Sequence, residues 1–206
     1  MDDRKRILNI FKETGALLEG HFILSSGQHS NRYFQCAKVL QYPEYLTAFS
    51  IMISDVFEDA KPDVVISPAI GGVVLGTEVG AKLGCRTIFS ERKNGVMVIW
   101  RGFNLEQDEK VLIIEDVITT GGSVREVMNL VERANAKILG LGVLVDRCDE
   151  KAKLHKNQYS IIKIKAESYH EDEVPDELNA IPIQKPGSRY SWRRILITYC
   201  SYLFYY

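Results

Sequence analysis

Residues 115–123, with the sequence EDVITTGGS, carry the side chains in this chain that are best placed to do chemistry. Glu115 and Asp116 are adjacent carboxylates, and two apolar residues, Val117 and Ile118, follow them. The run of hydroxyl and glycine residues that comes next consists of Thr119, Thr120, Gly121, Gly122 and Ser123. Such a run can wrap its N–H groups and hydroxyls closely around a phosphate, whereas carboxylates repel phosphate and suit sugar hydroxyls or a hydrated Mg²⁺. The segment therefore predicts a site for a phosphorylated sugar with a metal ion nearby.

A strand and a helix are expected to hold this loop in place. Val111–Ile114 is an apolar run that predicts a buried strand, and Val124, Val127, Met128 and Val131 recur at helical spacing. The first turn of a helix offers unpaired N–H groups and a partial positive charge, which favour a phosphate. No Gly-Lys-Ser/Thr follows the glycines and no G-x-G-x-x-G occurs, which excludes a Walker A loop and a dinucleotide fingerprint. The plain alternative is an ordinary strand-to-helix turn with exposed acids.

The stretch from 111 to 124 resembles the signature of the type I phosphoribosyltransferases, which bind 5-phosphoribosyl 1-pyrophosphate (PRPP). The resemblance implies that residues 115–123 bind PRPP, with the 5′-phosphate on the loop and the ribose hydroxyls on Glu115 and Asp116. It also implies Mg²⁺ held mainly by substrate and water near those two carboxylates. The implied fold is α/β, an open and mainly parallel sheet flanked by helices, with a small N-terminal hood. The alternation of predicted strands and helices independently favours a parallel sheet.

A second loop resembles the family's pyrophosphate loop. Residues 68–72 join a predicted strand, 64–67, to a predicted helix that ends near Leu83. The glycines make this turn a second candidate anion cradle. The resemblance implies that Ile70 and Gly71 contact pyrophosphate. A glycine turn without a ligand is the alternative.

Residues 90–102 resemble the mobile catalytic loop of the family. Arg92 and Lys93 stand at its basic root, and Arg101 is a further candidate cation. The resemblance implies a loop that closes over the active site of a partner subunit, in a homodimer with shared sites. Closure would keep water away from an electron-poor ribosyl carbon. A solvated charged loop is the alternative.

Three features resemble the orotate-specific branch of the family and imply orotate as the second substrate. Residues 15–40 predict a hairpin hood, in which Tyr33 and Phe34 would lie by the base. Arg147 follows Asp146 after a predicted strand, and a guanidinium suits the carboxylate-bearing edge of orotate. The resemblance adds Thr119 as an orotate contact, and residues 181–189 resemble the branch's usual ending. Two aromatic residues packing a hairpin and a surface salt bridge of Arg147 are the alternatives.

Length and composition set broad limits on the rest. The 206 residues predict one domain over 1–189, followed by an atypical aromatic tail over 190–206 whose apolar stretch is too short to span a bilayer. The formal net charge of -1 gives no case for a nucleic-acid partner. The charged N-terminus does not resemble a signal peptide, and the four scattered cysteines indicate free thiols. We therefore expect a cytoplasmic protein without a membrane partner.

The chain departs from the family at several loop positions. Ser25 and Ile70-Gly71 stand where many members carry lysine, and Val96–Ile99 is apolar where the catalytic loop is often richer in cations. Pyrophosphate binding would then depend on the remaining cations. Two other functions stay open at this point: transfer to a different nucleobase, and a non-catalytic regulator that senses PRPP.

Overall fold

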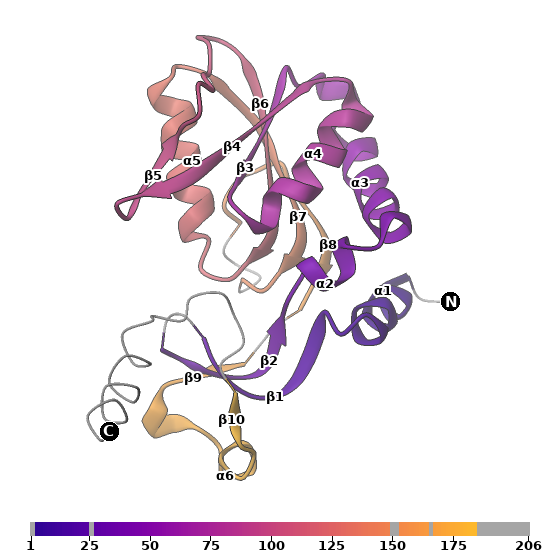
Figure 1. Ribbon diagram of the computed structural model, residues 1–206, viewed down its shortest axis with the longest axis vertical. Coiled ribbons are helices and arrows are strands. Elements are labelled where there is room, and N and C mark those ends of the chain that lie inside the picture. Colours follow the sequence, from indigo (N-terminus) through magenta and orange to yellow (C-terminus); the bar gives the residue numbers. More distant parts are fainter. Residues whose placement is uncertain (1–2, 25–26, 149–152, 165–166, 185–206) are drawn as a thin grey trace, which may run out of the picture. The chain divides into compact units, whose positions relative to one another are not determined.

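The computed structural model describes residues 3–24, 27–148, 153–164 and 167–184 (Figure 1). The chain divides into two compact units. The larger unit comprises Met1–Leu18 and Phe34–Ala166, and the smaller one comprises Glu19–Tyr33 and the segment that begins at Glu167. The predicted tail, 190–206, and Ser25 lie outside the described residues, as does the end of the segment 181–189.

The larger unit is built on a six-stranded sheet with the order β5-β4-β3-β6-β7-β8. These strands are β3 (Val64–Pro68), β4 (Arg86–Lys93), β5 (Val96–Ile99), β6 (Lys110–Ile118), β7 (Lys137–Asp146) and β8 (Gln158–Lys163). All neighbours pair in parallel except β4 and β5, which are antiparallel. The predicted open, mainly parallel sheet is confirmed.

Helices cover both faces of this sheet (Figure 1). The helices of the larger unit are α1 (Asp3–Glu13), α2 (Ala37–Leu40), α3 (Pro43–Phe57), α4 (Gly71–Leu83) and α5 (Gly122–Arg133), with a short 3₁₀ turn at Glu58–Ala60. Leu112 and Ile114 of β6 join a core cluster with α3 and α4, whereas Val111 and Ile113 join a second cluster with α5. This alternation follows from the period of two along a strand and shows why β6 is apolar on both faces.

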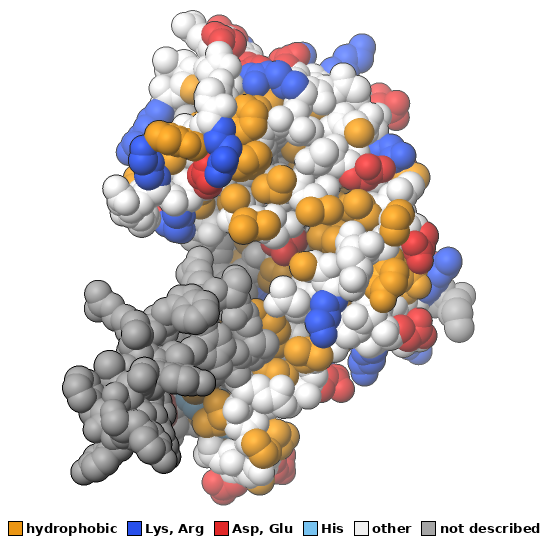
Figure 2. Space-filling model, viewed as in Figure 1, with side chains coloured by type: hydrophobic (Ala, Val, Ile, Leu, Met, Phe, Trp, Pro, Cys, Tyr) orange, Lys and Arg blue, Asp and Glu red, His pale blue; other side chains and the backbone are white. Residues whose placement is uncertain are grey.

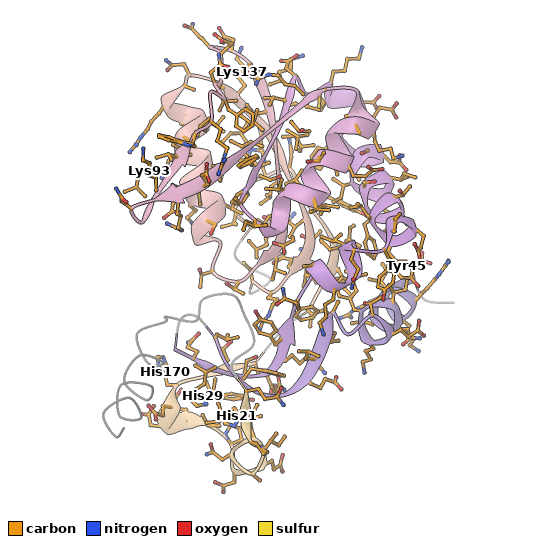
Figure 3. The ribbon with its side chains drawn as sticks, in the orientation of Figure 1. His21, His29, Tyr45, Lys93, Lys137 and His170 are labelled. Atoms are coloured by element: carbon orange, nitrogen blue, oxygen red, sulfur yellow. The ribbon has the colours of Figure 1, made fainter. Side chains whose placement is uncertain are left out.

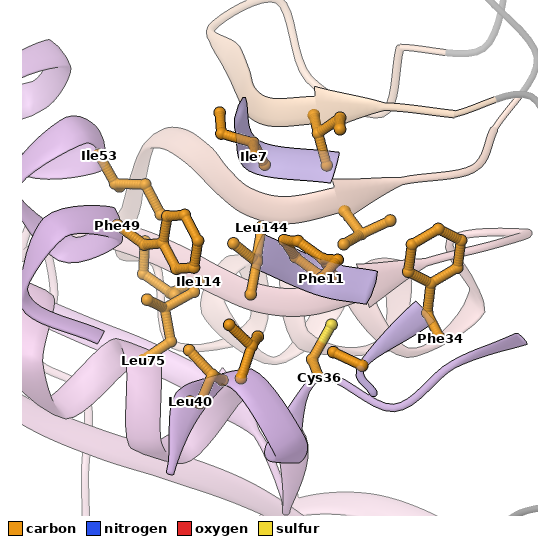
Figure 4. Close-up of a cluster of buried hydrophobic side chains, with 14 of the residues drawn as sticks. Ile7, Phe11, Phe34, Cys36, Leu40, Phe49, Ile53, Leu75, Ile114 and Leu144 are labelled. Atoms are coloured by element: carbon orange, nitrogen blue, oxygen red, sulfur yellow. The ribbon is translucent and has the colours of Figure 1, made fainter. Parts of the chain in front are cut away.

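The first of these clusters includes Ile7 and Phe11 of α1 and also Phe34 and Cys36, which pack with side chains of the sheet and its helices (Figure 4). Phe49 and Ile53 of α3 and Leu75 of α4 are fully or almost fully buried against β6 and β7. None of the helices among residues 3–24, 27–148, 153–164 and 167–184 combines the length and the apolar character that crossing a membrane requires.

The segment 90–102 is partly a β-hairpin, which corrects the prediction of a loop there. Strand β4 continues through Arg92 and Lys93, which pair with Met97 and Val96 of β5. Asn94 and Gly95 form the turn with φ angles of 53° and 83°. Asn-Gly is the preferred sequence of a two-residue hairpin turn, because both positions need positive φ. The apolar residues 96–99 are therefore strand residues.

The smaller unit contains a four-stranded sheet with the order β10-β1-β2-β9. Its strands are β1 (Leu17–Ile23), β2 (His29–Phe34), β9 (Ser168–Tyr169) and β10 (Ile183–Gln184), accompanied by a 3₁₀ turn at Glu171–Glu173 and by α6 (Asp176–Asn179). The predicted hood strands correspond to β1 and β2. Strands β9 and β10 were not predicted from the sequence, and they bring a distant segment to both edges of the hood.

Two buried histidines connect the strands of this hood (Figure 3). Nε2 of His21 lies 2.6 Å from Nδ1 of His29, and Nδ1 of His21 lies 3.3 Å from the carbonyl oxygen of Ile181. Because that carbonyl can only accept, His21 donates from Nδ1, and His29 then donates from Nδ1 to Nε2 of His21. The pair holds β1, β2 and the C-terminal segment together.

We expect Gly80→Ala to destabilise the larger unit through one methyl group. A Cβ at Gly80 of α4 would clash with Cγ2 of Thr87 on β4. Overpacking of this kind costs about 1–3 kcal/mol, which exceeds the helix-propensity gain of about 1 kcal/mol. Thr87→Ser removes the clashing methyl group and leaves the carbonyl oxygen of Cys85, 3.3 Å away, as the closest remaining contact. The same Gly80→Ala change made in that background should therefore cost clearly less. Urea unfolding of the four proteins measures both effects; equal losses in the two backgrounds would contradict the packing argument.

Candidate functional site

The acidic pair lies inside the end of β6 rather than beyond it. Pairing with β7 continues from Glu115, opposite Val143, to Ile118, opposite Asp146. Glu115 is buried, with 7% of its surface exposed, and Asp116 is half-buried. The strand therefore fixes both carboxylates on rigid backbone, just before the predicted phosphate loop.

Residues 119–121 connect β6 to α5 and are open to solvent at Thr119 and Thr120. Gly121 is the N-cap of α5 and adopts a φ of 75°, a conformation that glycine accepts without strain. Arg125, in the first turn of α5, holds the loop in place, because its Nη1 donates to the carbonyl oxygen of Thr120 at 2.5 Å. The N–H groups of the first helical turn have no partner within the helix and face the loop side, as an anion site requires.

Burial changes the acid–base behaviour of the two carboxylates. Desolvation raises the pKa of Glu115 well above its ordinary value, and the neighbouring Asp116 raises it further. Desolvation also raises the pKa of Asp116. Backbone donors partly offset this cost, since the N–H of Val117 donates to Oδ1 of Asp116 at 2.9 Å. A cation or a set of sugar hydroxyls would favour the ionised forms of both groups.

The second predicted loop lies directly against the acidic pair. Helix α4 begins at Gly71, where an added Cβ would overlap the carboxylate of Asp116. At Gly72 a Cβ would lie 2.9 Å from the carbonyl oxygen of Ile114. Only glycine permits this close approach. The Ala69–Ile70 peptide bond is cis, and the Ile70 side chain is 84% exposed. The structure thus brings the two predicted anion loops together around Asp116.

Arg147 follows β7 at the same edge of the sheet. Its N–H donates to the carbonyl oxygen of Ile118 at 2.9 Å, so the residue begins beside the phosphate loop. Its guanidinium carbon lies 5.7 Å from the ring centroid of Phe34. The Phe34 ring is 6% exposed and meets Phe11 edge to face.

These contacts differ for Tyr33 and Phe34, the two aromatic residues that were predicted to lie by the base. Adjacent residues of a strand point to opposite faces, so one ligand cannot contact both rings equally. Phe34 is a core residue that supports Arg147. The Tyr33 ring lies 5.8 Å from that of Phe22 within the smaller unit. A base contact by either residue stays a prediction.

The three predicted loop cations each contact a neighbouring group on or beside the β4–β5 hairpin. Arg92 forms a two-point ion pair with Glu126 of α5, with Nη2 and Oε2 2.6 Å apart. Nε of Arg101 donates to Oε1 of Glu91 at 2.8 Å, and Nζ of Lys93 lies 3.4 Å from the centre of the Trp100 ring. Figure 2 shows basic and apolar side chains next to each other in this part of the surface, and Figure 3 labels Lys93 near the end of the hairpin.

Some of the residues that hold this site together had no role predicted from the sequence. Asp146 is buried and accepts three hydrogen bonds, and the thiol of Cys148 donates to the carbonyl oxygen of Thr119 at 2.8 Å. The proximity of Cys148 to the phosphate loop depends on the pairing of β6 with β7, so no local signal reveals it. The pairing of Glu126 with Arg92 likewise joins two residues far apart in the sequence, one on α5 and one on β4.

We expect Glu115→Gln to stabilise the metal-free protein at neutral and alkaline pH. The raised pKa means that the folded state binds more protons than the unfolded chain. The free energy of unfolding therefore falls as pH rises from the ordinary glutamate pKa through the raised one. Glutamine cannot ionise, so the variant should escape this loss and unfold at a higher urea concentration than the unsubstituted protein at about pH 8, with the difference vanishing near about pH 4. A variant that is less stable at pH 8 would contradict the assigned burial cost.

Comparison with known proteins agrees with this geometry. A family model described as the phosphoribosyl transferase domain matches residues 37–177. The orotate phosphoribosyltransferase of Chlorobium phaeobacteroides is 55% identical over 183 residues, covering 89% of this chain and 95% of its own. The orotate phosphoribosyltransferase of Desulforamulus reducens is 46% identical over 187 residues, covering 91% of this chain and 98% of its own.

A solved structure shares the fold at lower sequence similarity. The crystal structure of orotate phosphoribosyltransferase from Aeropyrum pernix superposes with a TM-score of 0.67 at 22% identity, covering 77% of this chain and 94% of the other. The similarity to this structure shows a shared fold. The family model and the two relatives match the sequence itself, including the residues of the candidate site. The chain belongs to the phosphoribosyltransferase family, in the branch of the orotate phosphoribosyltransferases.

Proposed function

We propose that this chain transfers the phosphoribosyl group of PRPP to orotate, yielding orotidine 5′-monophosphate and pyrophosphate, a step of pyrimidine biosynthesis. The observation that carries the proposal is the position of Asp116, which lies at the end of β6 against Gly71 and just before the loop that starts α5. A carboxylate between two anion-binding loops suits a sugar that bears phosphate at both ends. The names of the relatives supply the identity of the base.

In this proposal residues 119–123 bind the 5′-phosphate. The exposed hydroxyls of Thr119 and Thr120, the Ser123 hydroxyl and the N–H groups of the first turn of α5 donate to it. Glu115 and Asp116 accept hydrogen bonds from the ribose hydroxyls. Val117 and Ile118 set the spacing between these two parts of the sugar. The reaction then needs no nucleophilic side chain, because orotate itself attacks the ribosyl carbon and the chain contributes positioning.

Arg147 and Thr119 orient orotate in the proposed site. The guanidinium offers a planar fork of donors that matches a carboxylate, and the ring of Phe34 limits its movement from one side. Tyr33 is proposed as a further contact from the hood. Specificity for orotate over bases without a carboxylate would rest mainly on the charge of Arg147.

Mg²⁺ fits this site as an ion that takes most of its ligands from substrate and water. The side chains supply two hard carboxylate oxygen donors, Glu115 and Asp116. Among residues 3–24, 27–148, 153–164 and 167–184, no group of three or more His, Cys, Asp or Glu side chains is arranged to hold a metal ion alone. When bound, Mg²⁺ would offset charge on the leaving pyrophosphate. The carboxylates would keep the ribose oriented toward it.

The leaving pyrophosphate requires cations and N–H donors from the chain. Gly71 and Ile70 offer the backbone of the second loop, at the start of α4. Arg92, Lys93 and Arg101 lie on or beside the β4–β5 hairpin, and we propose that they exchange their contacts with Glu126, Trp100 and Glu91 for contacts with pyrophosphate. Each exchange trades an exposed pair of small net value for a highly charged ligand.

We further propose that two copies of the chain share their active sites through this hairpin, in the cytoplasm. The free thiols of Cys36, Cys85 and Cys148 support a reducing compartment. If Arg92 acts in the partner's site, mixing equal amounts of inactive Arg92→Ala and inactive Asp116→Asn chains should restore roughly a quarter of the activity. Random pairing makes about half of the dimers mixed, and one of the two sites in each mixed dimer then holds both residues. Activity is measured after subunit exchange has been verified with two differently tagged chains; no recovery would contradict sharing.

The experiment that tests the function combines the purified protein with orotate, PRPP and Mg²⁺. Loss of orotate absorbance together with pyrophosphate release, both abolished by EDTA, is the expected result. A panel of adenine, guanine, hypoxanthine and uracil tests transfer to other bases. Turnover of one of these instead of orotate would favour a different nucleobase, and PRPP binding without turnover of any base would favour a regulator.

A further inference from the structure

The turn that carries Arg147 is fixed by a buried carboxylate that the proposed mechanism does not use. Asp146, the last residue of β7, is 4% exposed. Its Oδ1 accepts from the N–H of Cys148 at 3.0 Å, which closes a turn around Arg147. A carboxylate kept this far from water needs a structural reason, because burying a charge is costly.

The other oxygen of Asp146 connects this turn to β8. Oδ2 accepts from Nε2 of Gln158 at 2.9 Å and from Oγ of Ser160 at 3.1 Å. The orientation of the Gln158 amide is determined, because its Oε1 accepts from the N–H of Leu154 at 2.9 Å. Three neutral donors thus stabilise one negative charge, and together they hold the turn against the neighbouring strand.

Arg147 and Cys148 bind the turn to the residues that lead into the phosphate loop. The N–H of Arg147 donates to the carbonyl oxygen of Ile118 at 2.9 Å, and Sγ of Cys148 donates to that of Thr119 at 2.8 Å. On one side the turn is therefore bound to β8 through Asp146, and on the other it is bound to the residues that lead into the phosphate loop.

We propose that Asp146 is a positioning residue that determines orotate affinity through Arg147. Its carboxylate fixes the backbone on both sides of Arg147, so the guanidinium leaves the turn in one direction, beside the ring of Phe34. Positioned donors lose less freedom when they bind a ligand, which raises affinity without adding a contact. The inference rests on the proposed function, since it concerns how that site recognises its base.

Asp146→Asn tests the inference because it keeps the shape and removes the charge. An asparagine can still accept from Cys148, but its NH₂ group then faces the NH₂ group of Gln158. We expect kcat/KM for orotate to fall by ~10-fold, the effect of one charge-assisted hydrogen bond, while KM for PRPP changes by less than ~2-fold. Ile162→Val is the matched control: it removes a buried methyl group from β8 without touching Asp146 and should leave both constants unchanged.

A double-mutant cycle with Arg147→Ala separates positioning from a general structural effect. If Asp146 acts through Arg147, then Asp146→Asn should change kcat/KM for orotate by less than ~2-fold in the Arg147→Ala background, because coupled residues are not additive. An equal loss in both backgrounds, or no loss in the presence of Arg147, would overturn the inference. Should Asp146→Asn fail to fold, Ser160→Ala removes a single donor and is expected to show a smaller loss with the same dependence on Arg147. Absence of orotate turnover by the unsubstituted protein would instead contradict the proposed function.

Discussion

Replacing Asp116 with asparagine is expected to preserve the fold and to lower turnover by ~10²-fold or more, the scale of losing one key electrostatic group. Asparagine has the same shape, and its Oδ1 can still accept the hydrogen bond from the N–H of Val117. The substitution removes the charge that would hold the ribose and the metal environment between the two anion loops. Turnover at saturating orotate and PRPP measures the effect, and circular dichroism and thermal unfolding verify the fold.

A surface substitution of the same type provides the control. Asp108 forms an exposed ion pair with Lys137, in which its side chain is 61% exposed. Asp108 lies shortly before Lys110, the first residue of β6, at the opposite end of that strand from Asp116. Asp108→Asn removes one negative charge there and should leave turnover within ~2-fold, because exposed pairs contribute little. Turnover of Asp116→Asn near that of this control would remove Asp116 from the proposed mechanism.

Replacing Arg147 with alanine is expected to raise the orotate KM by ~10²-fold, in keeping with the 2–5 kcal/mol that truncating one partner of a buried charge pair typically costs. KM for PRPP should change by less than ~3-fold, because the N–H that ties residue 147 to Ile118 is retained in alanine. Initial rates with each substrate varied in turn separate the two constants.

Arg147→Lys sharpens this second prediction. Lysine keeps the positive charge and loses the planar fork, so the orotate KM should lie between those of the unsubstituted protein and the alanine variant. Equal rises of the two KM values in Arg147→Ala would show that Arg147 supports the whole site rather than the base.

The features that the sequence predicted are those encoded in contiguous residues. The apolar run before Glu115, the hydroxyl and glycine residues after it and the helical repeat of Val124, Val127 and Val131 all lie within one segment, and the structure places them as β6, a loop and α5. The position of Arg147 was also predictable, because parallel strands present their carboxyl ends at one edge of the sheet.

The features that sequence analysis missed depend on residues far apart in the chain or on alternation within a strand. Asp146 and Cys148 acquire their roles only when β7 lies between β6 and β8. Phe34 looked like a partner of Tyr33, but the pleat of β2 separates the two rings and leaves Phe34 in the core. Asn94-Gly95 was a local turn signal that the family resemblance obscured, since the family favours a loop there.

The smaller unit has a consequence for how the protein is made. β1 and β2 are near the N-terminus, yet their sheet is completed by β10, and the contact of His21 with Ile181 spans 160 residues. The hood strands therefore emerge from the ribosome long before β9 and β10 exist. An isolated two-stranded hairpin is marginally stable in water, so β1 and β2 lack a stable sheet at that stage. Contacts of such high sequence separation form slowly. We therefore expect the hood to assemble last, after the larger unit has folded around β6.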